Sequence, residues 1–187
     1  MTTTTRVPRS TWLACVLLAC AGTALAEPCA LSVSQSRVDL GDLLYPQRAP
    51  GHATDAPHVL GTRQVAVQVH CPTESSISVM LRGIPQDNGV LFAQRGELEV
   101  QMHDAVLDGR PVMLQATDML PAAPNAGAER TRVLPGQKVV PMTAGQPARG
   151  SNLTLQMSLT STVPLDELVA RDSKTLSASI NLEVIGQ

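Results

Sequence analysis

The sequence predicts an all-β protein in which two antiparallel sheets pack face to face as a sandwich. Apolar and polar residues alternate with a period of two in one segment after another, which is the pattern of strands with one buried face. Turn residues separate these segments, and helical periodicity is confined to one short stretch. A closed barrel is the second architecture that fits such a pattern.

An export signal is expected before the domain. Arg6 and Arg9 precede the apolar run WLACVLLACAG, and small residues follow it up to Ala26. This order is typical of a secretory signal peptide cut after Ala26, so residues 27–187 form the expected single domain. The apolar run is too short to predict a membrane span. A lipoprotein signal ending at Cys20 is the alternative, because LLAC resembles a site of cysteine acylation.

The expected mature domain keeps two cysteines, Cys29 and Cys71. Each shares its strand parity with nearby apolar residues, so both sulfurs are expected on the buried side. A lone pair in an exported protein most often forms a disulfide, here between the first two strands. The alternative is a metal site, although no CxxC or HxxxH spacing supports it. The histidines that could complete it are His52, His58, His70 and His103.

Five segments show the alternation of a half-buried strand. They are RQVAVQVHC (63–71), SISVMLRG (76–83), GELEVQMHD (96–104), SNLTLQMSLT (151–160) and TLSASINLEVIG (175–186). In the last segment, the expected buried face consists of Leu176, Ala178, Ile180, Leu182 and Val184.

Turn and helix signals separate these strands. Asp108-Gly109 predicts a tight hairpin, and PQDNG (85–89) and PGQ (135–137) are further breaks. One short helix is expected at 162–172, with Thr162 as its cap and Pro164 in its first turn. The remaining loops are expected at 45–58 and 120–131. About seven short strands in one exported domain favour a sandwich of immunoglobulin-like type.

Charge and composition argue against several function classes. The formal net charge is −2 and the basic residues are scattered, so neither a nucleic acid nor an anionic membrane is the expected main partner. Aromatic residues make up 2% of the chain, which disfavours a stacking site for sugars or bases.

No enzymatic activity and no cofactor are expected. The chain has no GxSxG, HExxH, SxxK or GxGxxG motif, and nothing else brings a nucleophile together with a base. The nearest polar cluster is His103-Asp104 with Asp108, which we interpret as a solvated strand face and its turn. Any active site would have to involve these three residues.

In their order along the chain, these motifs resemble the subunits of chaperone-usher fimbriae (pili). The resemblance covers residues 27–187. It rests on Cys29, VDLG (38–41), VAVQVHC ending at Cys71, ISVMLRG after it, GELEVQMHDAVLDGRPV (96–112) and the final alternating strand. It implies an immunoglobulin-like sandwich that lacks its seventh strand. The face carrying Leu176, Ala178, Ile180, Leu182 and Val184 would then border an open apolar groove.

The resemblance also implies partners and a location. A periplasmic assembly chaperone lends the missing strand during export, and the N-terminal extension of a neighbouring subunit replaces it at the outer-membrane usher. Such strand addition uses main-chain hydrogen bonds and pockets for alternate side chains. The expected location is the cell-surface fimbrium, and the expected role includes adhesion to a host or surface receptor.

Two departures from the family pattern modify these expectations. Only Glu27 and Pro28 precede Cys29 if the signal is cut after Ala26, so we expect a subunit that accepts a strand without donating one, most plausibly at the fibre tip. The penultimate residue is Gly186, where the family usually has an aromatic residue. The alternative function is a self-contained periplasmic or lipid-anchored β-sandwich binding module. In that case CALSVS (29–34) or KVVPM (138–142) closes the open edge from within.

Overall fold

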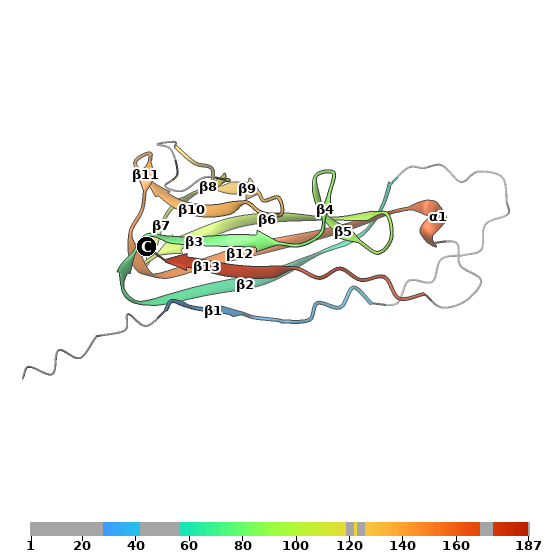
Figure 1. Ribbon diagram of the computed structural model, residues 1–187, viewed down its shortest axis with the longest axis horizontal. Helices are drawn as coiled ribbons and strands as arrows, with labels where there is room; N and C mark the ends of the chain where they lie inside the picture. Colours follow the sequence, from blue (N-terminus) through green and yellow to red (C-terminus); the bar gives the residue numbers. More distant parts are fainter. Residues whose placement is uncertain (1–27, 42–56, 119–121, 123–125, 169–173, 187) are drawn as a thin grey trace, which may run out of the picture.

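The computed structural model describes residues 28–41, 57–118, 122, 126–168 and 174–186. The described chain is almost entirely β-structure and forms two sheets, so the predicted all-β class is confirmed (Figure 1). The expected signal peptide at 1–26, Cys20 within it and most of the expected loop at 45–58 lie outside the described residues.

The larger sheet has the strand order β1-β2-β12-β6-β5-β4, and β7 and β9 also pair with β6. Its long central strands pair over most of their length, for example Leu155 with Val67 and Met157 with Met102. The strands are β1 (Ala30–Val33), β2 (Pro57–Ser75), β4 (Pro85–Gln86), β5 (Gly89–Phe92), β6 (Gly96–Leu107), β7 (Arg110–Pro111), β9 (Arg130–Arg132) and β12 (Gly150–Pro164).

The smaller sheet has the order β11-β10-β3-β13, and β8 also pairs with β10. Its strands are β3 (Ile77–Arg82), β8 (Met113–Thr117), β10 (Lys138–Thr143), β11 (Gln146–Pro147) and β13 (Asn181–Gly186). Every pairing between the strands of either sheet is antiparallel.

The core lies between the two sheets. Val67, Val100 and Leu155 of the larger sheet and Val79 and Leu81 of the smaller sheet are at most 2% exposed and belong to one cluster. Because alternate residues of each strand point into this layer, the predicted period-two pattern is sufficient to build it.

Four of the five predicted strands are confirmed as parts of β2, β6 and β12 and as β3, which is one residue shorter at each end than the predicted 76–83. The fifth was expected over 175–186, but only Asn181–Gly186 forms a strand. The reason is the length of its partner, because Arg82, which pairs with Asn181, is the last residue of β3. Residues 174–180 continue from β13 without regular structure.

The predicted helix at 162–172 is confirmed only over Leu165–Leu168. Thr162 is not a cap, because β12 continues through it and pairs it with Glu97 of β6. Helix α1 (Leu165–Leu168) begins only after Pro164, the last residue of β12. Residues 169–172 of the expected helix lie outside the described residues.

The predicted disulfide joins Cys29 and Cys71. β1 pairs with β2 in a register that sets Ala30 opposite His70, so Cys29 lies opposite Cys71. Both sulfurs are therefore engaged, and the alternative of a thiolate metal site is wrong. Over the described ranges, no group of three or more His, Cys, Asp or Glu residues is placed to hold a metal ion. No helix in these ranges has the length and apolar character to cross a membrane.

Candidate functional site

Two strand edges face each other along one side of the molecule. β1 pairs only with β2, and β13 pairs only with β3, among the described strands. Between these edges lies a groove of about 1200 Å³, bordered by residues 31–41 on one side and 174–182 on the other. Figure 1 shows β13 in red and β1 in blue running along the same side of the sandwich, with β2 drawn between them. The groove is therefore an unfilled position between the two sheets.

The first wall consists of β1 and of residues 34–41, which continue from β1. Residues 34–41 lie alongside β2 without forming a strand. The backbone N–H of Ser34 donates to the carbonyl of Ala66 at 2.9 Å. Further along, the Arg63 guanidinium donates to the carbonyls of Asp39 and Leu40, both at 3.2 Å. The wall is thus tied to β2 at both ends. Its half-buried apolar side chains are Leu31, Val33, Val38 and Leu40.

The second wall is formed by residues 174–182, and it carries most of the face predicted from the sequence. Leu176, Ala178, Ile180 and Leu182 line the groove, and all but the exposed Ala178 also pack against the core. Val184 packs against the core without lining the groove. The N–H of Ala93 donates to the Ser177 carbonyl at 2.9 Å, which fixes this wall to the turn between β5 and β6.

The floor of the groove is apolar. Val65, Leu98, Met157 and Leu159 come from three neighbouring strands of the larger sheet, and each is at most 7% exposed. Phe92, Leu60 and Leu168 add to the apolar lining. A floor and two walls of this composition suit apolar side chains that enter from an extended segment.

The end of the groove at α1 is polar. Glu167 lines the groove and is 6% exposed, and its Oε1 accepts the N–H groups of Gln94 and Arg95, each at 3.0 Å. Its neighbour Asp166 is exposed and forms an ion pair with the Arg95 side chain. The hydrogen bond that the Arg95 side chain donates in this ion pair holds the pKa of Asp166 below its ordinary value. Glu167 escaped the sequence analysis because a glutamate in a short helix is usually solvated.

The interpretation of His103 as part of a solvated strand face is wrong. His103 is 7% exposed, because Asp104 has a φ of 52° and the pairing of β6 with β12 shifts register beside it. Such a bulge turns neighbouring side chains away from strict alternation. His103 Nε2 lies 2.8 Å from Ser158 Oγ, and His103 Nδ1 lies 2.8 Å from Asp104 Oδ2.

This serine–histidine–aspartate arrangement has the connectivity of a hydrolytic triad but not its accessibility. Ser158 is 4% exposed, lies within β12, and its hydroxyl donates to Gln64 Oε1 at 3.0 Å. The Ser158 oxygen thus lies between its two hydrogen-bond partners, Gln64 and His103, and is largely covered. The array therefore satisfies buried polar groups.

Asp108 serves the turn that was predicted from Asp108-Gly109. Both residues have positive φ, 48° and 78°, and join β6 to β7, so the hairpin is confirmed. The Asp108 carboxylate accepts the N–H of Asn152 at 2.8 Å and that of Ser151 at 3.1 Å. These hydrogen bonds lower the pKa of Asp108 and tie the turn to the start of β12.

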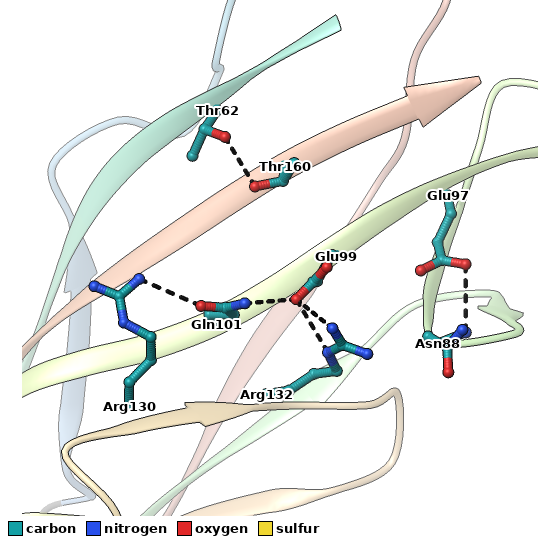
Figure 2. Close-up of polar contacts among 8 residues, drawn as sticks. All are labelled: Thr62, Asn88, Glu97, Glu99, Gln101, Arg130, Arg132 and Thr160. Atoms are coloured by element: carbon teal, nitrogen blue, oxygen red, sulfur yellow. Dashed lines mark hydrogen bonds and ion pairs between the residues drawn. The ribbon is translucent and has the colours of Figure 1, made fainter. Parts of the chain in front are cut away.

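The outer face of the larger sheet is polar and internally paired. Figure 2 shows a chain of contacts in which Arg130 reaches Gln101, Gln101 reaches Glu99, and Glu99 accepts from Arg132. Thr62 and Thr160 are hydrogen-bonded at 2.9 Å across β2 and β12. Because these groups satisfy one another, the face offers less to a ligand than the groove does.

The two segments expected to close the open edge in the alternative function lie elsewhere. CALSVS contains β1, which pairs with β2, and KVVPM lies in β10, which pairs with β3 on the side away from β13. Neither forms the missing neighbour of β13. Neither a protein-family model nor a curated protein matches this chain.

Proposed function

We propose that the chain is a subunit of a chaperone-usher fimbria whose immunoglobulin-like sandwich is completed by a strand from another molecule. The observation that supports this most directly is the apolar groove between the edges of β1 and β13. A strand laid in this groove would pair with backbone groups of an edge strand and set alternate side chains onto the floor.

The dimensions of the groove fit a short extended segment. The wall at 174–182 spans nine residues, which corresponds to at most about 30 Å at 3.3 Å per residue. An occupant of about eight or nine residues would therefore place about four alternate side chains on the floor. Each apolar side chain fully buried there contributes roughly 1.5–3 kcal/mol before the cost of ordering the strand.

The partners follow from this mode of binding. A periplasmic assembly chaperone supplies the first occupant, and a neighbouring subunit replaces it at the outer-membrane usher, which leads the protein to the cell-surface fimbrium. An exposed apolar edge is an aggregation hazard, which explains the need for a chaperone. A position at the fibre tip, with contact to a host or surface receptor, rests on the expected cut after Ala26.

Export with and without the chaperone tests the proposal. We expect the protein to accumulate and copurify with a periplasmic assembly chaperone, and to aggregate or be degraded when exported alone. The mass of the purified chain gives its mature N-terminus, which tests the cut after Ala26 and the lipidation of Cys20. Soluble, cooperative folding of the chain alone, with no uptake of a donor peptide, would refute the proposal.

The second candidate is the self-contained binding module. It is favoured by the hydrogen bonds of Ala93 to Ser177 and of Arg63 to Asp39 and Leu40, which hold both walls of the groove through contacts within the chain itself. A small apolar ligand would then fill the groove in place of a strand. Such a module would fold when exported alone and would bind its ligand with no contribution from the backbone edge of β13.

A further inference from the structure

One polar atom in the groove lacks a partner. Glu167 Oε1 accepts two backbone N–H groups, but Glu167 Oε2 is buried and has no hydrogen-bond partner among the described residues. The residue is 6% exposed and lines the groove. A buried carboxylate oxygen without a donor is costly, so its presence in a binding groove points to a missing group.

None of the cations that the structure describes around the groove supplies that group. The Arg95 side chain is paired with Asp166, and the Arg63 guanidinium donates to the carbonyls of Asp39 and Leu40. Arg37 and Lys174 also line the groove, but both are exposed, and the described contacts join neither to Glu167. The donor that fits a buried carboxylate best is a charged one, because charge-assisted hydrogen bonds are about twice as strong as neutral ones.

We propose that the strand occupying the groove carries a lysine or arginine at the end next to α1, and that this side chain donates to Glu167 Oε2. The inference rests on the proposed function, since it assigns a chemical feature to the same occupant. Figure 1 shows α1 at the end of the sandwich opposite β13's terminus. The basic residue therefore lies at the end of the groove away from the disulfide.

This contact gives the occupant a register. The floor is apolar along its length, so strands of alternating apolar residues can bind in registers displaced by two residues at similar cost. A single ionic contact at one end penalises every displaced register, because each leaves Glu167 Oε2 without a donor. The same contact selects one direction of the strand over the other.

Synthetic donor peptides test the assignment with the full chain, exported together with the assembly chaperone and purified as that complex, from which a bound peptide releases the chaperone. Three nine-residue peptides alternate valine with threonine and differ only at their two end positions. The first peptide has lysine at the first position and norleucine at the last, the second has norleucine at the first and lysine at the last, and the third has norleucine at both. We expect one of the two lysine peptides to bind about 10-fold more tightly than the norleucine peptide. The other lysine peptide should bind no more tightly than norleucine.

The variant Glu167→Gln should remove this preference, whereas Asp166→Asn, which removes the adjacent exposed charge, should keep it. Equal binding of all three peptides to the unaltered chain overturns the assignment of Glu167, but it agrees with the proposal that the groove binds a strand. Failure of every peptide to bind overturns the proposed function itself. Because the comparison among peptides uses the unaltered chain, the test stands even if Glu167→Gln fails to fold. A lysine preference that Lys174→Gln removes and Glu167→Gln keeps also overturns the assignment.

Discussion

Gly186 lies against the sulfur of Cys29. A Cβ atom added to Gly186 would lie 2.9 Å from Cys29 Sγ, closer than real Cβ contacts come. The contact brings the end of β13 to the start of β1, at the disulfide end of the groove. It also gives a physical reason for glycine at a position where an aromatic residue was the family expectation.

Gly186→Ala should therefore destabilise the protein. Cys29 Sγ is held in the disulfide and cannot rotate away, so the backbone of β13 has to move. We expect a loss of about 1–3 kcal/mol in the free energy of unfolding, measured by urea denaturation. Ser179→Ala, an exposed change in the same segment, should have no effect. An unchanged Gly186→Ala variant would contradict the close contact.

Removal of the disulfide should cost more. The bond closes a span of 42 residues, which corresponds to roughly 4 kcal/mol in the chain-entropy model. The double variant Cys29→Ala/Cys71→Ala should lower the free energy of unfolding by about that amount, out of a total of about 5–15 kcal/mol. Reduction of the unaltered protein gives an independent measurement, and the two values should agree.

The parts of the fold that could be predicted are those set by local pattern. Long strands with one buried face produced the alternation seen in β2 and β12, and Asp108-Gly109 predicted its hairpin because that turn needs positive φ. The disulfide was predicted from the strand parity of Cys29 and Cys71 and from their being the only cysteine pair after the expected signal. The apolar face of 175–186 was visible in the sequence, and all of its side chains except Val184 line one wall of the groove.

The parts that could not be predicted depend on pairing between distant segments. The bulge at Asp104 arises because β6 has one extra residue between His103 and Val106 relative to the paired stretch of β12 from Gln156 to Thr154. That bulge buries His103. The length of β13 is set by the end of β3 at Arg82. Glu167 acquires its role from Gln94 and Arg95, more than seventy residues earlier in the chain. No local pattern reports any of these relationships.

Stability should depend on the charge of Asp108 at acidic pH. Its pKa in the folded protein is lowered from 3.8 by hydrogen bonds from Asn152 and Ser151. The contribution of the charged form is therefore present above the unfolded pKa and is lost as pH falls through the lower folded value. Compared with Asp108→Asn, the unaltered protein should be more stable at pH 6, and the difference should shrink below about pH 4. A stability difference between the two proteins that stays constant down to pH 2 would argue against these hydrogen bonds.

Asp87→Asn, in an exposed turn, is the matched control.

The buried His103 contact should be structural. Ser158→Ala removes the hydroxyl 2.8 Å from His103 Nε2 and leaves a buried ring nitrogen without that partner. We expect a loss of about 1–3 kcal/mol in the free energy of unfolding. Thr160→Ala, two residues along β12 with a more exposed hydrogen bond to Thr62, should cost less than about 1 kcal/mol. Ester hydrolysis by the unaltered protein that Ser158→Ala abolishes, with no loss of stability, would reverse this interpretation.

The wall of the groove should control capture of a strand. Ile180 lines the groove and is half-buried, whereas Ile84 is 65% exposed and does not line it. Because an occupant would bury the remaining surface of Ile180, Ile180→Ser should weaken binding of an alternating valine–threonine peptide about 10-fold. Ile84→Ser makes the same chemical change outside the groove and should leave the affinity unaltered. Fluorescence anisotropy of a labelled peptide measures both, and equal losses in the two variants would mean that the peptide binds the protein somewhere other than between β1 and β13.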